Sequence, residues 1–540
     1  MTRPRKTVSP PAFEQSRDYV QSLARGLAVL AAFDVEHPTL GLAGVASRTG
    51  LSRAAVRRLM LTLAHLGYVR AVGREYALSP RVLELGFGCL GSLKLNDLAQ
   101  PLIEQLAQRL NHSCSMAVLD GQSIVYVLRV PVRRVMTVAL GAGARLHLED
   151  GRSILDMSSL AECSNLGHQH PRVVAAIRAQ AEQLCFVTSS WGARPRAELA
   201  DRLLELAGFE DGRVFFTLGG ADANEHAVKI LRQALGRPRG IVVARDRSYH
   251  GSTHLAMALS GDTRTQALVD PDAMRVSHVE PPYAYRCPFG SGNDAECGER
   301  AAAAIAERID HLGRDQVAAV IVEPNAGSNG IVAPDSYWPA VRRHTADRGI
   351  PLIADEVMSA FGRCGEWFAW QRHGEAGRPD VITLAKGLTG ATVPLGAVIL
   401  SGDIAARLEN QVLDTGLTYC GHPLACAAGV AAIAAYEDER LIERSRRLGS
   451  TLRQALDRLA ERHPVIGDVR GGHGLFAVLE LVTDRVSRQP LAPWPQTPPP
   501  LKALLAAAMA EGVSFGSRGN LLLLAPPLVI EEQDLAAAIS

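Results

Sequence analysis

The chain has 540 residues, of which 47% are hydrophobic and 21% charged, with a formal net charge of +1. This is the composition of an ordinary globular protein of three or four domains, without overall acidic or basic bias. It holds no apolar run of the roughly 18 residues needed to span a bilayer, and its basic start lacks the apolar core of a secretory signal. The nine cysteines show no zinc-site spacing, so we expect reduced thiols, no metal and a cytoplasmic location.

After a tail expected to be disordered over residues 1–16, the chain begins with helix-like segments. Apolar residues recur at helical spacing in Ser22–Phe33, and a short second helix is expected over Leu42–Thr49. A third helix, Arg53–Leu66, is expected to bury Leu59, Leu63 and Leu66. Residues 68–79 then alternate around a glycine as a β-ribbon does. This order predicts a winged helix-turn-helix domain over residues 17–80.

Arginine is concentrated in this head. Ser52 is the expected N-cap of the third helix, and Arg53 and Arg57 lie at its exposed start, where a recognition helix meets base edges. Arg58 and Arg74 are placed to contact phosphates. Each arginine taken singly is as easily a solvated charge, but the ordered set indicates DNA binding. The expected DNA contacts are Ser52, Arg53, Arg57, Arg58 and Arg74.

Residues 22 to about 145 resemble the IclR family of bacterial transcription regulators. The resemblance rests on SLARGLAVLAAF, LAGVASRTGLSRAAVRRLMLTLAHLGYV and SPRVLELG, and it continues to about Arg145. It implies a linker helix and the first part of an effector-binding domain. Because the family pattern stops at Leu146, we expect a truncated remnant over residues 81–147 without a closed effector pocket.

From residue 148 onward, strand-like runs alternate with amphipathic helical segments, which predicts a doubly wound α/β fold. The expected strands are Arg213–Phe216, Ile241–Ala244, Val317–Val322, Leu352–Ala354, Val381–Leu384 and Gly396–Leu400. The Pro-rich stretch Gln489–Pro500 is expected to be a loop in a smaller second domain. The expected boundaries are 148–420 for the large domain and 421–540 for the small C-terminal domain.

Two of these strands end beside residues of opposite charge. Asp355 follows Ala354 directly, and Lys386 follows Leu384 by two residues. Ligands bind at this edge of open α/β sheets. A lysine and an aspartate there suit pyridoxal phosphate, because the lysine can form a Schiff base with it and the aspartate can keep its pyridine nitrogen protonated. On these two residues alone, an ion pair between surface loops is an equal alternative.

Other strand ends carry residues for the same purpose. Gly220 and Ala221 lie between a strand and a helix, where small residues let backbone N–H groups approach a phosphate. A plain turn is the more usual explanation of such a pair. Glu323 ends another strand, directly before a proline.

Two further residues can contact the faces of an aromatic ring. Tyr249 follows the strand Ile241–Ala244 and can stack on such a ring, although a single tyrosine is usually part of the packing. Val357 points to the same side of an extended chain as Asp355, so it can press on the opposite ring face.

Residues from about 150 to 540 resemble the class III aminotransferases. The matching stretches are LGHQHPRVVAAI, FFTLGGADANEHAVKI, RSYHGST, VIVEP, LIADEVMSAFGR, ITLAKG, TGLTYCGHPLACAAG and RGNLLLLAPPLVI. The resemblance implies the pyridoxal-phosphate-dependent transferase fold of type I, with a mostly parallel sheet. It implies Lys386 and Asp355 as catalytic residues. The implied cofactor contacts are Gly220, Ala221, Tyr249, Glu323, Asp355, Val357, Lys386 and Thr418.

The resemblance also implies an assembly and a substrate site. Thr418 is implied to reach the phosphate of a neighbouring subunit in a homodimer or dimer of dimers, and Arg518 to bind a substrate carboxylate or sulfonate. The chain departs from many relatives at Ala221, where they have serine or threonine, and at Met358, where they have glutamine. The expected activity is transfer of an amino group from a β-alanine- or taurine-like ω-amino acid, or a related amine, to a keto acid such as pyruvate. The alternative is a transcription regulator that uses the aminotransferase-like body as an amine sensor.

Overall fold

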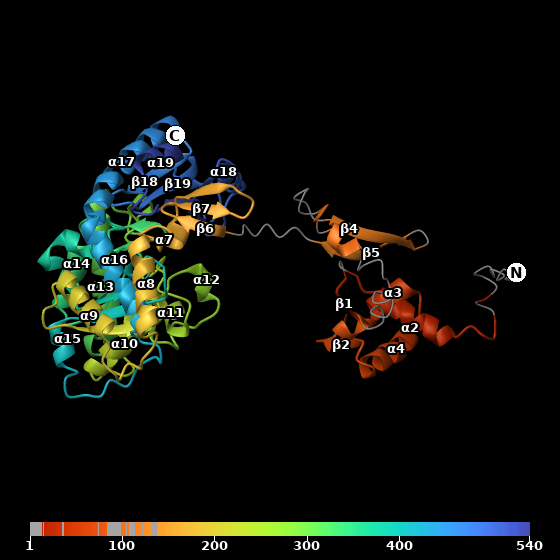
Figure 1. Cartoon of the computed structure of the whole chain (residues 1–540). Coiled ribbons are helices and arrows are strands. Elements are labelled where there is room, and N and C mark those ends of the chain that lie inside the picture. Colours follow the sequence, from red (N-terminus) through yellow and green to blue (C-terminus); the bar gives the residue numbers. More distant parts are fainter. Residues whose placement is uncertain are drawn as a thin grey trace. The chain divides into compact units, whose positions relative to one another are not determined.

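The computed structural model describes residues 13, 16–34, 37–73, 75–83, 99–103, 105–106, 114–120, 123–130 and 138–540. The chain divides into two compact units, Met1–Val135 and Met136–Ser540, here called the head and the body (Figure 1). Most of the expected tail, most of the linker segment and Arg74 lie outside the described residues.

The head contains the expected winged helix-turn-helix. Helices α2 (Gln21–Ala31), α3 (Leu42–Thr49) and α4 (Arg53–His65) enclose a small core. Strands β1 (Thr39–Leu40), β3 (Glu75–Leu78) and β2 (Val69–Val72) form an antiparallel wing in that order. The expected first hairpin of the remnant is also present as β4 (Cys114–Asp120) and β5 (Ser123–Val130).

The recognition helix begins as expected but rotates its buried face. The Ser52 side chain caps α4 by accepting a hydrogen bond from the Ala55 amide at 3.3 Å. The buried residues of α4 are Val56, Met60 and Leu63. The expected stripe was therefore wrong at Leu66, which is exposed, and Leu59 is only half-buried. The stripe begins one turn earlier because β-branched Val56 packs between α2 and α3 in the core.

The body is built on a seven-stranded sheet of order β11-β10-β12-β15-β16-β17-β9. Strands β10 (Ile241–Arg245), β12 (Val317–Val322), β15 (Leu352–Asp355) and β16 (Val381–Leu384) run parallel to their neighbours in this group. β17 (Gly396–Leu400) is antiparallel to both β16 and β9 (Arg213–Thr217). The sequence analysis missed the edge strand β11 (Val276–Val279), which pairs with β10.

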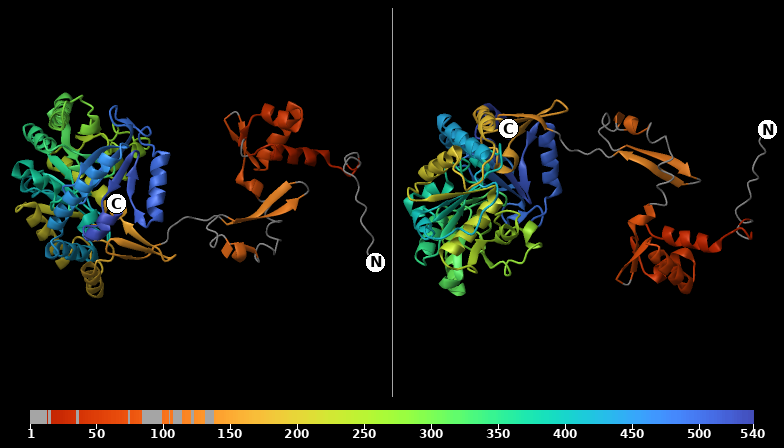
Figure 2. Two further views of the ribbon diagram at one scale, coloured as in Figure 1. Left: turned by 90° about the horizontal axis from the view of Figure 1, so that it is seen from above. Right: turned by 60° about the horizontal axis from the view of Figure 1, so that its bottom comes forward.

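This sheet is buried on both faces. Successive residues of β12 and β15 alternate between two hydrophobic clusters: Val320 and Leu352 belong to one, and Ile321 and Ile353 to the other. Helices cover both faces (Figures 1 and 2). Full burial explains why these strands are continuous apolar runs rather than alternating ones.

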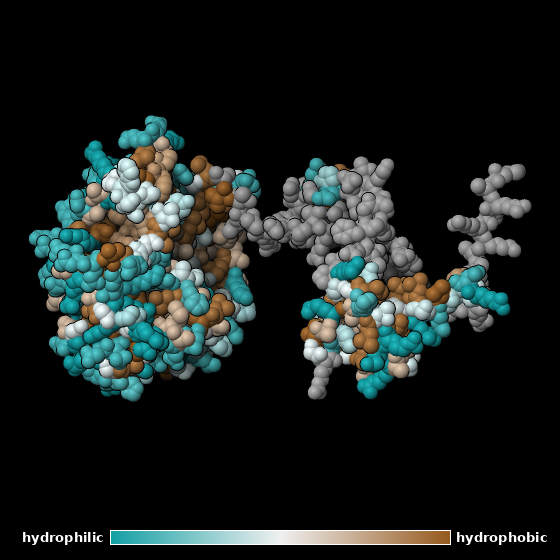
Figure 3. Space-filling model, turned by 90° about the horizontal axis from the view of Figure 1, so that it is seen from below, coloured by the Kyte–Doolittle hydropathy of each residue, from teal (hydrophilic) through white to brown (hydrophobic). Residues whose placement is uncertain are grey.

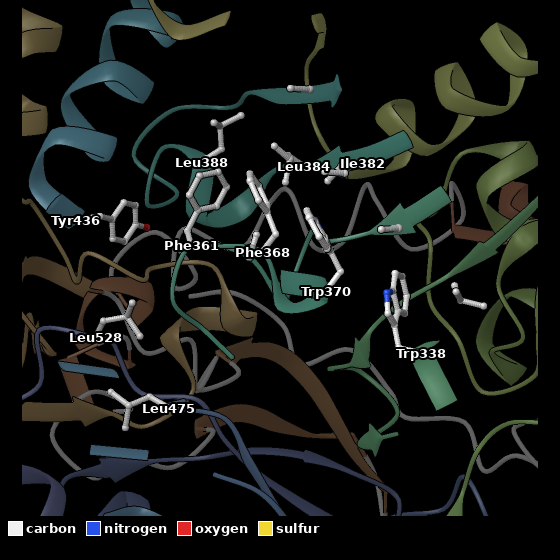
Figure 4. Packing of buried hydrophobic residues seen from close by; sticks show 14 of the residues in the cluster. Trp338, Phe361, Phe368, Trp370, Ile382, Leu384, Leu388, Tyr436, Leu475 and Leu528 are labelled. Atoms are coloured by element: carbon white, nitrogen blue, oxygen red, sulfur yellow. The ribbon is translucent and has the colours of Figure 1, made fainter. Parts of the chain in front are cut away.

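The helices that cover the sheet come from most of the body. They are α8 (Pro171–Gln183), α9 (Arg194–Ala207), α10 (Gly220–Ala234), α11 (His254–Leu259), α12 (Thr263–Gln266), α13 (Asp294–Leu312), α14 (Tyr337–Ala346), α15 (Gly402–Ala406), α16 (Pro423–Asp438), α17 (Leu441–Arg462), α18 (Pro499–Ala510) and α19 (Glu532–Ile539). Aromatic rings fill the space below the sheet, with Phe361 stacked on Tyr436 at 5.8 Å between ring centroids (Figure 4). That packing fixes the segment that follows Asp355.

Both ends of the body join in smaller sheets. β6 (Val138–Ala142), β7 (Arg145–Leu148) and β8 (Ser153–Asp156) form a sheet with the distant β21 (Val513–Ser514). β18 (Ile466–Gly471), β19 (Ala477–Asp484), β23 (Leu521–Leu524) and β22 (Gly516–Arg518) form the second. The stretch expected as a loop, 489–500, holds the short β20 (Gln489–Pro490) and the start of α18.

This arrangement corrects the boundary expected at residue 147. The hairpin β6–β7 was assigned to the regulator remnant, yet β7 pairs with β8 along Arg145–His147, and the compact unit starts at Met136. Leu146, Leu148 and Ile154 bury one another, so this hairpin is part of the hydrophobic core of the body.

Candidate active site

Asp355 ends the central strand β15 and is buried. One carboxylate oxygen, Oδ2, accepts hydrogen bonds from Asn224 Nδ2 and lies 2.7 Å from His250 Nδ1, while Oδ1 accepts from the Val357 amide at 3.0 Å. Three contacts hold the carboxylate in one orientation. A buried aspartate held in this way is preorganised to bind a cation or a protonated ring nitrogen.

Asn224 lies on α10, which crosses the end of the sheet. Its Nδ2 also donates to the His250 carbonyl at 2.9 Å, and its Oδ1 accepts from Thr383 Oγ1 at 2.6 Å. Thr383 is the register partner of Asp355 on β16. The neighbouring strand therefore orients the amide that orients the carboxylate.

Lys386 begins the turn after β16 with φ +41°, a backbone conformation that side chains other than glycine rarely adopt. Residues held in this region cost of order 1–3 kcal/mol and cluster at functional sites. The lysine side chain is about one-quarter exposed, and its Nζ lies 3.2 Å from Glu162 Oε2. The ion pair that the sequence left as an alternative for Lys386 does exist, but its partner is Glu162 rather than Asp355.

A cavity of about 320 Å³ lies between these strand ends. Of the residues expected to contact the cofactor, it brings together Gly220, Ala221, Tyr249, Glu323, Asp355, Val357 and Lys386. The sequence analysis did not assign its other lining residues, such as Asn224, His250, Ser252 and Ser328. Met358, noted as a departure from relatives, also lines it.

The start of α10 approaches the cavity wall closely. A Cβ atom on Gly220 would lie 2.9 Å from Val357 Cγ1, and one on Gly251 would lie 2.4 Å from Ala221 Cβ. Only glycine fits either position without displacing the wall. The helix start, with its N–H groups and positive dipole end, provides the surroundings that a phosphate needs.

Glu323 lies at the end of β12 beside Arg245. Arg245 Nη2 donates to Glu323 Oε2 at 3.2 Å, and Glu323 Oε1 accepts from the Tyr249 amide at 3.4 Å. Burial raises the pKa of Glu323, against the opposing effect of Arg245. The contact positions the segment that carries Tyr249, whose hydroxyl lies 2.9 Å from Ser252 Oγ.

Two expected site residues lie outside this cavity in the single chain. Thr418 is exposed and is not among the lining residues. Arg518 Nη2 donates to Asp262 Oδ1 at 2.7 Å, and Arg264 also binds Asp262 while it lies 4.8 Å from the centre of the Tyr249 ring. Arg518 is thus connected to the cavity through Asp262, Arg264 and Tyr249.

Among the residues that the sequence analysis missed, Asn224 and His250 had a readable signal. Asn224 is one helical turn after Gly220, so it faces the same end of the sheet, and His250 is adjacent to Tyr249. Glu162 had no such signal, because its position depends on a turn of unusual backbone conformation far from Lys386 in sequence.

Comparison with known proteins agrees with this geometry. Residues 129–540 match the family model described as aminotransferase class-III, and residues 22–73 match the IclR helix-turn-helix domain. The chain is similar to the diaminobutyrate–2-oxoglutarate transaminase of Halomonas elongata, with 34% identity over 415 residues that cover 73% of this chain and 86% of that protein. It is also similar to the putrescine–pyruvate aminotransferase of Pseudomonas aeruginosa, with 32% identity over 75% of this chain and 89% of that protein.

A solved structure gives the same result for the fold. The taurine:2-oxoglutarate aminotransferase of Bifidobacterium kashiwanohense, in complex with PLP and glutamate, superposes with a TM-score of 0.71 at 35% identity, over 78% of this chain and 93% of that one. The mixed central sheet, the strand-end lysine and aspartate and the family match agree on one enzyme class and one cofactor, pyridoxal phosphate. The chain belongs to the class III aminotransferases and carries an IclR helix-turn-helix domain at its N-terminus.

Proposed function

We propose that this enzyme moves an amino group from an ω-amino acid such as β-alanine or taurine, or from a related amine, to a keto acid such as pyruvate. The observation that carries the proposal is the placement of Lys386 and Asp355 in one cavity, with Asp355 fixed by three contacts. A cytoplasmic location, expected from the scattered cysteines, is part of this proposal.

The residues of the cavity fit pyridoxal phosphate. Gly220 and Ala221 would hold its phosphate at the start of α10, Tyr249 and Val357 would enclose its ring, and Asp355 would hold a proton on the ring nitrogen. When bound, the cofactor withdraws electrons from the bond that breaks at the substrate carbon. The other catalytic tasks, namely orienting the donor, excluding water and carrying the proton, are left to the protein.

Lys386 is placed to carry that proton. Its strained backbone fixes the start of the side chain at the end of β16, and its Nζ is the basic group that lines the cavity opposite Asp355. A proton carrier held within hydrogen-bond reach of the reacting atom contributes about 10²- to 10⁴-fold to the rate. The lysine must be uncharged when it accepts the proton.

The proposed binding group for an acidic substrate end is Arg518. Because Arg264 and Arg518 share one carboxylate, Asp262, the three side chains together keep a positive charge beside Tyr249. Arg518→Ala should raise KM for β-alanine about 10-fold or more, since charge-assisted hydrogen bonds contribute about 1.5–3 kcal/mol. KM for the uncharged donor 1-aminopropane, measured with the same enzyme, is the control. Equal increases for both donors would make Arg518 a structural residue.

The aminotransferase proposal has a direct spectroscopic test. The purified holoenzyme is mixed with β-alanine, taurine or an alkylamine in the absence of keto acid, and the absorbance of the cofactor is followed. Conversion by at least one donor, and reversal on addition of pyruvate with formation of alanine, supports amino-group transfer. Conversion that pyruvate and other keto acids fail to reverse would contradict it.

We also propose that the head binds DNA. Arg53, Arg57 and Arg58 are exposed on α4, and none of their side chains makes an ion pair or hydrogen bond with other described residues. Free cations at the start of a recognition helix are available to phosphates and base edges. The alternative function, a regulator whose body senses amines, requires this binding and in addition a change in DNA affinity when an amine is bound.

The arginines of α4 give a testable expectation. Replacing Arg53 and Arg57 by alanine should weaken binding to the preferred site about 10-fold or more, because each base contact contributes about 1–3 kcal/mol. It should also flatten the salt dependence for each phosphate contact that is lost. Arg239→Ala, at an exposed arginine of the body, is the matched control. If the wild-type protein prefers no sequence over random DNA, the head has no regulatory function.

A second copy of the chain is part of both proposals. Helix-turn-helix proteins of this kind read paired half-sites, and Thr418 is proposed to contact the cofactor phosphate of a neighbouring subunit. Val20, Leu23 and Leu27 are exposed apolar residues at and before α2, and hydrophobic residues gather on one face of the head in Figure 3. Such a stripe supports pairing of two heads.

A further inference from the structure

Glu162 is a buried carboxylate whose printed ion-pair partner, among the described residues, is the catalytic lysine. Its side chain is 9% exposed, and its Oε2 lies 3.2 Å from Lys386 Nζ. Arg264 lies near enough for the charge of Glu162 to raise the pKa of that guanidinium, although Arg264 is held by Asp262. Neither the proposed cofactor contacts nor the proposed acid-binding group explains a carboxylate here.

The backbone holds Glu162 in this place at a cost. Ser159, Leu160, Ala161 and Glu162 all have φ between +46° and +69°, and each such non-glycine residue costs about 1–2 kcal/mol. Ser159 anchors the turn, because its Oγ donates to the Ala525 carbonyl at 2.6 Å and accepts from Arg363 Nη2 at 3.0 Å. The surrounding structure therefore imposes a strained turn that ends with Glu162 against the lysine.

The ion pair conflicts with catalysis. A carboxylate 3.2 Å from an amine favours the charged ammonium, whereas Lys386 accepts a proton only as a neutral amine. When the lysine is attached to the cofactor or acts as a base, it no longer supplies the three N–H donors of an ammonium to Glu162. An unpaired buried carboxylate is strongly unfavourable, so the working state needs another cation beside it.

We propose that Glu162 selects amino donors that carry a second, distal positive charge, namely short diamines and diamino acids, by pairing with that charge. This inference rests on the proposed amino-group transfer and narrows its donor class. The distal ammonium takes over the role of Lys386 as partner of Glu162, which leaves the lysine free to become neutral. The donor's own charge thus activates the base.

The same geometry disfavours purely acidic donors. A donor such as β-alanine brings a second carboxylate into a cavity where Glu162 already carries a buried negative charge, and like charges this close repel. A neutral alkylamine neither pairs with Glu162 nor repels it. The three donor types therefore respond differently to removal of the charge.

The test uses the full-length holoenzyme with three donors and saturating pyruvate: 1,4-diaminobutane, 1-aminopentane and β-alanine. The first two have similar length and differ in the distal charge. In Glu162→Gln, kcat/KM for 1,4-diaminobutane should fall about 10- to 100-fold relative to 1-aminopentane, while that for β-alanine should rise relative to it. Glu162→Asp keeps the charge and should keep the order of donors.

A binding measurement separates this inference from turnover. Holoenzyme reduced with borohydride has Lys386 fixed to the cofactor and cannot react, so titration calorimetry with 1,4-diaminobutane reports binding alone. We expect Glu162→Gln to raise Kd about 10-fold or more. Asp438→Asn is the control, since Asp438 is an exposed carboxylate paired with Arg172 on the surface of the body.

The outcomes are distinct. Equal changes for all three donors, together with an unchanged Kd for 1,4-diaminobutane, would show that Glu162 is a structural residue and would overturn the inference. If the wild-type enzyme transfers no amino group from any donor, the proposed function fails, and the Kd difference still decides whether Glu162 binds the distal cation.

Discussion

Lys386→Ala is expected to lower kcat by at least about a thousandfold, because one side chain supplies both the covalent attachment of the cofactor and the proton carrier. No other lysine of the chain can replace it in this cavity: the described Lys229 and Lys502 are exposed and do not line it. Steady-state transamination with saturating donor and pyruvate measures the loss. The cofactor absorbance of the variant should also lack the signature of covalent attachment.

Lys502→Ala is the matched control for this experiment, since it removes an exposed lysine of α18 in the same unit. Its kcat should equal that of the wild-type enzyme. Lys386→Ala also removes the partner of Glu162, so some loss of stability is expected, and the melting temperature of the variant should be measured beside its activity. A folded variant with kcat within 10-fold of wild type would exclude Lys386 as the catalytic lysine.

Asp355→Asn is expected to lower kcat about a hundredfold or more while cofactor binding persists. A neutral amide no longer holds a proton on the ring nitrogen, and each lost ~1.4 kcal/mol of transition-state stabilisation is a factor of ten in rate. The new amide also faces the Asn224 Nδ2 donor at the position of Oδ2. The rate of donor conversion in a single turnover measures the effect without the keto-acid half-reaction.

The neighbouring Glu356 provides a control for burial. It is as deeply buried as Asp355 but accepts from Ser359 Oγ and, at 3.0 Å, from the Trp370 amide, outside the cavity. Glu356→Gln should alter stability and leave the single-turnover rate close to wild type. If Asp355→Asn reacted as fast as Glu356→Gln, the proton on the ring nitrogen would not depend on Asp355.

The sequence predicted the parts of this protein that depend on local pattern. Buried parallel strands are uninterrupted apolar runs, so the ends at Asp355 and Lys386 were readable, and with them most of the cavity wall. Ser52 was readable as a cap because its role depends only on the next three residues. The recognition helix and the wing followed from the same local signals.

The missed features depend on tertiary structure. β11 is an edge strand whose burial alternates, with Ser277 and His278 half-buried, so it lacks the continuous apolar run of the inner strands. The hairpin β6–β7 belongs to the body because β8 and the distant β21 complete its sheet. Glu162 reaches Lys386 through four residues in the left-handed region, a conformation that their types do not favour.

The most direct test of the account is to locate the lysine that holds the cofactor. The holoenzyme is reduced with borohydride and digested, and the peptide that carries the pyridoxyl label is sequenced by mass spectrometry. The account predicts the label on Lys386, in the peptide containing ITLAKG, and its loss after incubation with a productive amino donor before reduction. A label on Lys229 or Lys502, or one that no amino donor removes, would contradict the site described for this enzyme.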